Sequence, residues 1–228
     1  MKINRWRDIW EWGLLISIFS FFGCAGPNSL YSVNMYYDAD KAAIPAYLKA
    51  DKASNAIISI AEFTDTRQMD DRLVIGRVVE KDGMSNLVLP KNIKATKAIS
   101  NGIKEYLRKA GYKVADKIVP WDLKEETIPK EDFKILIGGN IDELEISCRR
   151  GFPSNTYTAN MKLTIVFADM AKRKILYQSK VESSYTKEYF WFSEENLGEQ
   201  AGIALGDAIE KLFEDKVVAQ KLKEAIAQ

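Results

Sequence analysis

The sequence predicts an α+β fold in which a mostly antiparallel sheet carries two amphipathic helices packed on one face. Apolar and polar residues alternate from Tyr157 to Asp169, which is typical of a strand with one buried face. After the turn sequence MAKRK, a similar run from Ile175 to Tyr185 completes an antiparallel hairpin. Residues 93–110 and 194–215 carry apolar side chains at helical spacing, so each predicts a helix with one buried stripe.

Shorter strands are expected on both sides of the first helix. Residues 57–65 (IISIAEFTD) are apolar at nearly every position, which suits a strand covered on both faces. Residues 73–79 (LVIGRVV) form a second strand-like run, in which Gly76 indicates a bulge or the close approach of another segment. Asp82-Gly83 predicts a turn, and residues 112–119 predict a short strand.

A longer strand is expected over residues 134–148, with a change of phase inside it. Its apolar residues occupy one parity up to Ile141 and the other parity from Leu144 onward. A β-bulge near Asp142 would return both sets to a single buried face. Gly138-Gly139 lies inside this strand and lacks the Lys-Ser/Thr ending of a phosphate loop, so these glycines indicate bending or close packing.

Composition excludes several classes of function. The chain has 228 residues and a net charge of +1, and the part after residue 23 is neutral, so it offers no broad attraction to a nucleic-acid backbone. Histidine is absent, which removes His-based catalytic triads and His-containing metal sites. Two cysteines are too few for a structural zinc site. We therefore expect no enzyme activity, no metal and no cofactor, although composition alone leaves carboxylate or Ser-Lys catalysis open.

The first 23 residues have the organisation of a signal peptide. A basic start is followed by an apolar run of nine residues, 14–22, whereas a membrane-spanning helix needs about 20. Residues 21–24 (FFGC) then resemble the lipobox of bacterial lipoproteins. They match it at Gly23 and Cys24, and they depart from it at Phe21 and Phe22, where leucine and a small residue are usual.

The lipobox resemblance implies that a diacylglycerol is attached to the Cys24 thiol, that the chain is cleaved before this residue, and that the new amine is acylated. Several acyl chains would then hold the protein in a membrane, since a single chain binds only marginally. Ala25 is not the aspartate that retains many such proteins in the inner membrane. The resemblance therefore implies the periplasmic face of the outer membrane. The alternative is an uncleaved signal anchor with an incidental cysteine.

Three regions follow from this organisation. Residues 1–23 are expected to form the signal peptide, and residues 24–55 a polar tether with a possible short helix at 44–53. Residues 56–228 are expected to form the α+β domain, whose last helix ends near Asp215 or continues toward Gln228.

Two segments of the domain resemble the YajG-type family of bacterial lipoproteins. The first is ISIAEFTDTRQMDDRLVIGR (58–77), in which Asp65-Thr66-Arg67 and Ile75-Gly76 match the family pattern. The second is the hairpin followed by ENLGEQAGIALGDAIEKLFED (195–215). The order of strands and helices is also similar to that of LptE-type lipopolysaccharide-assembly lipoproteins. Because the YajG-type family is defined by its lipoprotein signal and domain, the resemblance implies an envelope lipoprotein without an established activity.

Two polar positions are candidate sites. Asp65 and Arg67 could form a pair that reads an anionic ligand, or they could fix a loop through an Asx turn and a salt bridge, which is the commoner role. Cys148 stands beside Arg149 and Arg150, whose charges favour a reactive thiolate. Its inward parity on the strand instead favours a buried and inert side chain, and we expect the inert role.

An aromatic stretch, EYFWFSEEN (188–196), precedes the second helix, and Ser193 is its expected N-cap. Tyr189, Phe190 and Trp191 would point alternately to opposite sides of an extended segment, so the core cannot easily hold all three. We expect at least one of them, Trp191 above all, to be exposed and to contact a partner or the membrane.

Two functions are consistent with these features. The first is a lipid-anchored, non-catalytic module that binds a protein partner in the cell envelope. The alternative is an assembly factor that handles lipid or lipopolysaccharide. An apolar groove would favour lipid handling, and a polar-rimmed patch would favour a protein partner.

Overall fold

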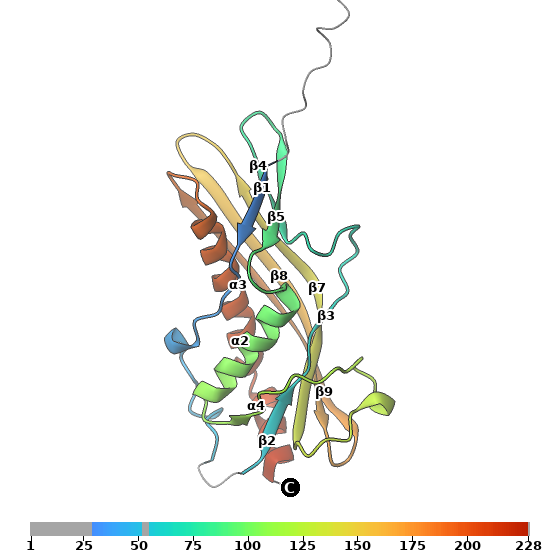
Figure 1. The fold of residues 1–228 in the computed structure, drawn as a ribbon. Helices are drawn as coiled ribbons and strands as arrows, with labels where there is room; N and C mark the ends of the chain where they lie inside the picture. The colour runs from blue at the N-terminus through green and yellow to red at the C-terminus, as the bar shows by residue number, and fades with distance from the viewer. Residues whose placement is uncertain (1–28, 52–54, 228) are drawn as a thin grey trace, which may run out of the picture.

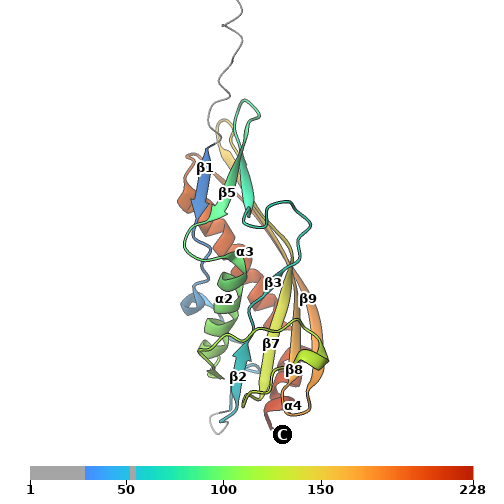
Figure 2. The same ribbon diagram turned by 45° about the vertical axis from the view of Figure 1, so that its right-hand side comes forward.

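A computed structural model describes residues 29–51 and 55–227, and its α+β fold agrees with the prediction (Figure 1). A nine-stranded sheet carries the helices α2 (Ala95–Lys109), α3 (Glu194–Glu214) and α4 (Lys216–Ala227). Figure 2 shows that these helices lie on the same side of the sheet. No helix within the described residues is both long and apolar enough to span a membrane.

The sheet is organised around the long strand β7 (Ile135–Arg149). Along one edge, β7 pairs antiparallel with β8 (Asn155–Asp169), and β8 pairs antiparallel with β9 (Lys174–Tyr189), which confirms the predicted hairpin. The opposite edge of β7 is shared by three shorter parallel strands, which are β2 (Ile57–Ile60), β3 (Thr64–Asp65) and β4 (Gly76–Val79).

The remaining strands extend this second edge and make the sheet mixed. The strand β5 (Ser85–Pro90) pairs antiparallel with β4, and β1 (Leu30–Val33) pairs parallel with β5. The strand β6 (Lys113–Val114) pairs parallel with β2. Two 3₁₀ turns, η2 (Ala39–Lys41) and η3 (Glu125–Thr127), lie in the connections. The longest pairings are therefore antiparallel, while the short strands add parallel pairs that the sequence did not predict.

The predicted bulge lies where the phase of β7 changes. The register with β8 shifts between Ile141 and Glu143. As a result, Leu144 and Ile146 are buried in the same core cluster as Ile137 and Ile141. The bulge thus keeps one face of a fifteen-residue strand apolar throughout.

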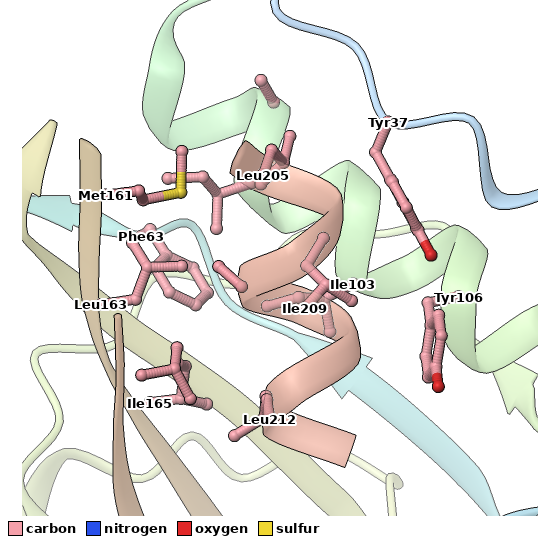
Figure 3. Packing of buried hydrophobic residues seen from close by; sticks show 14 of the residues in the cluster. Tyr37, Phe63, Ile103, Tyr106, Met161, Leu163, Ile165, Leu205, Ile209 and Leu212 are labelled. Carbon is pink, nitrogen blue, oxygen red and sulfur yellow. The ribbon is translucent and has the colours of Figure 1, made fainter. Parts of the chain in front are cut away.

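The main core lies between the sheet and the helices. Figure 3 shows Met161, Leu163 and Ile165 of β8 facing the helical layer, where Ile209 of α3 and Ile103 of α2 meet. A second, smaller cluster lies on the other face of the sheet. There the loop segment 115–134 places Val119, Trp121 and Ile128 against side chains of β7 and β8. One end of the sheet is therefore covered on both faces.

The tether predicted for residues 24–55 is wrong in its described part. Residues 29–51 belong to the folded body, because β1 joins the sheet and Val33, Met35 and Tyr37 are buried. The segment crosses α3 at glycines, and an ideal Cβ on Gly202 would lie 2.5 Å from the carbonyl oxygen of Tyr36. The alternation of buried side chains at positions 33, 35 and 37 is a strand-like signal that composition alone obscured.

Two further expectations about helices are corrected. The described part of the possible helix at 44–53 is a turn, in which Leu48 N donates to the carbonyl of Pro45. The predicted last helix, α3, ends at Glu214, and a second helix, α4, begins at Lys216. The backbone between them is extended, and the Asp215 carboxylate accepts a hydrogen bond from Val217 N at 2.8 Å, so α4 starts as a separate helix.

Candidate functional site

Asp65 and Arg67 form an ion pair with each other. Arg67 is 5% exposed, and its Nη2 lies 2.7 Å from the Asp65 carboxylate. Asp65 also accepts the backbone N–H of Arg67 at 3.2 Å, which is the Asx turn considered from the sequence. The guanidinium donates further hydrogen bonds to the carbonyls of Arg72, Val74 and Leu144.

These bonds use the whole hydrogen-bonding capacity of the guanidinium. Nε and Nη2 bind the carboxylate, both Nη1 bonds reach backbone carbonyls, and the second Nη2 bond reaches another. No N–H of Arg67 is left for an anionic ligand. The pair instead ties the loop after β3 to the bulged part of β7, so the structural role of Asp65 and Arg67 is the one that the geometry favours.

Cys148 is also a structural residue. Its side chain is completely buried, and burial raises the pKa of its thiol to about 11. The thiolate is therefore scarce at neutral pH despite the neighbouring arginines.

Gly139 serves close packing, because an ideal Cβ there would lie 2.3 Å from the carbonyl oxygen of Thr164.

The aromatic stretch before α3 does not follow the alternation of an extended segment, because β9 ends at Tyr189 and the backbone bends at 190–191. Trp191 is 84% exposed and Phe190 is 75% exposed. Tyr189 instead packs against the body, where its ring meets Tyr157 edge-on at 5.3 Å and its hydroxyl donates to Glu199 at 2.6 Å. The expected exposure of Trp191 is thus confirmed, and Tyr189 is removed from the candidate contact residues.

Hydrogen bonds from asparagine side chains hold the backbone that carries these exposed rings. Asn155 is 5% exposed, and its Nδ2 donates to the carbonyls of Tyr189 and Phe190 at 3.2 and 3.1 Å. Asn196 Nδ2 donates to the carbonyl of Trp191 at 3.3 Å. Because three successive carbonyls are bound by amide side chains, the fold itself directs Phe190 and Trp191 outward.

Ser193 completes this junction as the predicted N-cap of α3. Its hydroxyl accepts the backbone N–H of Asn196 at 3.1 Å, and its own N–H donates to the hydroxyl of Tyr157 at 3.0 Å. Phe192, between the exposed rings and the cap, stacks on Tyr157 at 6.2 Å. The guanidinium of Arg150 covers the same phenyl ring at 5.0 Å.

Two exposed apolar residues from distant parts of the sequence join this end of the molecule. Phe152, in the loop between β7 and β8, is 92% exposed, and Met84, in the turn between β4 and β5, is 58% exposed. We call Met84, Phe152, Phe190 and Trp191 the apolar tip. Figures 1 and 2 show that their three segments lie at the same end of the body.

Specific contacts tie the three segments of the apolar tip together. The Asn155 side chain, which binds the β9 end, also accepts Gly151 N from the β7–β8 loop at 3.4 Å. Arg150 of that loop pairs with Glu80 of the β4–β5 turn at 2.9 Å. Sequence reasoning missed Met84 and Phe152, and the signal that could have found Phe152 is an aromatic residue beside a proline between two predicted strands.

A groove of about 720 Å³ lies beside the tip, between the end of β1 and the start of α3. Its lining is mainly polar and includes Asn34, Lys91, Glu194 and Glu195. Glu194 accepts the backbone N–H of Ser32 at 3.0 Å and so joins β1 to α3. The lining suits water and polar groups better than an acyl chain.

The other predicted features are located as follows. Cys24 and the signal peptide lie outside the described residues. Within residues 29–51 and 55–227, no group of three or more Cys, Asp or Glu side chains is placed to hold a metal ion.

No protein family and no curated protein matches this sequence. Among solved structures, the Xanthomonas campestris protein XCC0632 is 10% identical, with a TM-score of 0.49 over 86% of this chain and 99% of that protein. The PelC dodecamer of Paraburkholderia phytofirmans is 11% identical, with a TM-score of 0.38 over 70% and 87% of the two chains. Lipoprotein GNA1162 of Neisseria meningitidis is 11% identical, with a TM-score of 0.33 over 65% and 94%. All three TM-scores are below 0.5, so these likenesses carry no argument about function.

Proposed function

We propose that this protein is a lipid-anchored lipoprotein of the cell envelope whose folded body is a non-catalytic module that binds an envelope protein. The observation that carries the proposal is Cys24, which directly follows Gly23 at the end of a nine-residue apolar run. Ala25 in the next position supports the periplasmic face of the outer membrane. The resemblance to YajG-type lipoproteins agrees with this assignment.

The chemistry of the body supports binding rather than catalysis. Histidine is absent from the sequence. The guanidinium of Arg67 is fully occupied by internal hydrogen bonds, and the Cys148 thiol is buried with a raised pKa. The residues that sequence reasoning considered for ligand binding or nucleophilic chemistry therefore have structural roles.

The polar groove favours a protein partner over lipid handling. Lysine and glutamate side chains line it, whereas an acyl chain needs an apolar channel. A role in handling lipid or lipopolysaccharide remains the alternative, and the LptE-type resemblance is what supports it.

Replacement of the candidate lipidation site tests the anchor. The variant Cys24→Ser should accumulate as an unprocessed precursor and should incorporate no labelled fatty acid. The variant Cys148→Ser is the matched control, because it removes the other cysteine and should be processed normally. Normal processing of Cys24→Ser would overturn the lipoprotein assignment.

Crosslinking in intact envelopes, followed by purification of the full chain, tests the binding role. A protein that is recovered reproducibly would support the proposal. Recovery of bound lipid or lipopolysaccharide without a protein partner would instead support the alternative function.

A further inference from the structure

We propose that the apolar tip docks onto the surface of the lipid bilayer and holds the body upright on its own anchor. This inference rests on the proposed lipid attachment at Cys24. It adds a second contact with the membrane, which orients the domain, and it assigns Phe152, Phe190 and Trp191 as the residues that enter the interface.

The length of the chain between the anchor and the body constrains the position of the tip. Ser29 is the first described residue, and its N–H donates to the Asn86 side chain at 3.0 Å, close to the β4–β5 turn. Only five residue steps separate Cys24 from Ser29, which gives a reach of at most roughly 18 Å. The end of the body that carries the tip therefore lies near any bilayer that holds Cys24.

The side chains of the tip have the chemistry of a membrane interface. Tryptophan and other amphipathic aromatic residues concentrate at the boundary between headgroups and acyl chains. The exposed rings project from a base fixed by Asn155 and Asn196, so insertion requires no refolding. Exposed apolar side chains gathered on one end of a protein mark a contact surface more often than scattered ones do.

Charges around the tip do not favour one sign. Lys81 and Arg149 are exposed near it, and so are Asp82 and Glu188. Contact with the bilayer should therefore depend on apolar burial and should be nearly independent of anionic lipid and of salt.

Docking would also fix which end of the molecule faces away from the membrane. The strands β7, β8 and β9 run lengthwise from the tip, and fifteen residues of β8 span up to about 50 Å. The turn at 170–173 and helix α4 lie at the far end (Figure 1). An upright body would hold that end in the aqueous space, where a partner can reach it.

The test uses the full lipidated chain reconstituted into phosphatidylcholine vesicles, with a polarity-sensitive fluorophore on Phe152→Cys. Phe152 is almost fully exposed, so this change removes no core packing. The same fluorophore on Ala171→Cys reports on the far end. We expect a blue shift and quenching by spin-labelled lipid at position 152, and neither effect at position 171.

A double variant identifies the residues responsible. Phe190→Ser combined with Trp191→Ser should abolish the blue shift at position 152, while the protein still floats with the vesicles through its acyl chains. Val217→Ser is the matched control, since Val217 is 47% exposed on α4 at the far end and should leave the shift unchanged.

Flotation separates the two proposals. A wild-type chain that does not float with vesicles would overturn the anchor at Cys24. A chain that floats while its label at position 152 stays in water would overturn docking alone. Crosslinking of that water-exposed tip to an envelope protein would then assign it to a protein partner instead.

Discussion

The Asp65–Arg67 pair and the aromatic stretch with Phe190 and Trp191 were both candidate sites in the sequence, but the pair is buried in the fold and the two rings are exposed. Arg67 has the side chain better suited to bind a ligand, but it is 5% exposed and its N–H donors are bound within the protein. Trp191 has no catalytic chemistry, and it is 84% exposed above a fixed backbone.

This contrast shows that hydrogen-bonding capacity matters more than residue type in judging a candidate site. A guanidinium whose donors are all used within the protein stabilises the fold, and its loss leaves a carboxylate and several carbonyls unpaired. An exposed aromatic ring adds little to folding, and the contact with the bilayer proposed above would give the rings of the apolar tip a role. The predictions below test both halves of this contrast.

The largest effect is expected for Arg67→Ala. Removal of one member of a buried ion pair typically costs about 3–5 kcal/mol of unfolding free energy. Arg67→Lys should recover only part of the loss, since an ammonium cannot reproduce the planar fork. The measurement is denaturant unfolding, with exposed Arg72→Ala as the control. If Arg67→Ala and Arg72→Ala unfold at the same midpoint, the pair is not structural.

A smaller loss is expected for Gly202→Ala on α3. Its Cβ would lie 2.5 Å from the Tyr36 carbonyl oxygen, and overpacking of this kind costs about 1–3 kcal/mol. Alanine is otherwise the better helix former, so any loss must come from the contact with the N-terminal segment. Gly198→Ala, with 3.0 Å to the Asn34 carbonyl oxygen, should lose less stability. A more stable Gly202→Ala variant would show that residues 34–37 do not pack on α3.

The buried interior should also be sensitive to alkaline pH. Burial raises the pKa of Tyr112 to about 12, and its hydroxyl donates to the carbonyl of Leu48 at 2.7 Å. Tyrosine in the unfolded chain ionises near pH 10. The stabilisation is therefore complete below about pH 10 and is lost as the pH rises toward 12. The melting temperature should fall less steeply with pH across this range in Tyr112→Phe than in the unchanged protein. An equally steep fall in both would contradict the burial of this hydroxyl.

The smallest effect on stability is expected at the tip. Phe190→Ser and Trp191→Ser should each change the unfolding free energy by less than about 0.5 kcal/mol, because exposed side chains lose little on substitution. In a chain of residues 25–228 with Trp121→Phe, measured in solution without lipid, the emission of Trp191 should be red-shifted and open to soluble quenchers. A blue-shifted emission that resists quenching would place the ring in the core and would remove the tip as a contact surface.

The elements whose signals are local could be predicted from the amino-acid sequence. The β8–β9 hairpin, helices α2 and α3, the bulge beside Asp142 and the Ser193 cap follow from the spacing of residues close together in the chain. Such signals survive without tertiary information because each reports on one buried face or one helix end. Exposure of at least one ring in 189–191 was predicted from a local signal of the same kind, but the exposure of the neighbours Phe190 and Trp191 together follows from the bend at 190–191, where β9 has ended.

The contacts between distant segments could not be predicted in this way. β1 pairs with β5, which follows it by 57 residues in the register Leu30 to Leu87, so a segment predicted as a tether became part of the sheet. Met84 and Phe152 joined Phe190 and Trp191 because strand pairing brings three turns to one end. The role of Arg67 depended on carbonyls up to 77 residues away. Contacts at such separations leave no periodic trace in the sequence, because chain closure and packing, rather than local conformation, determine them.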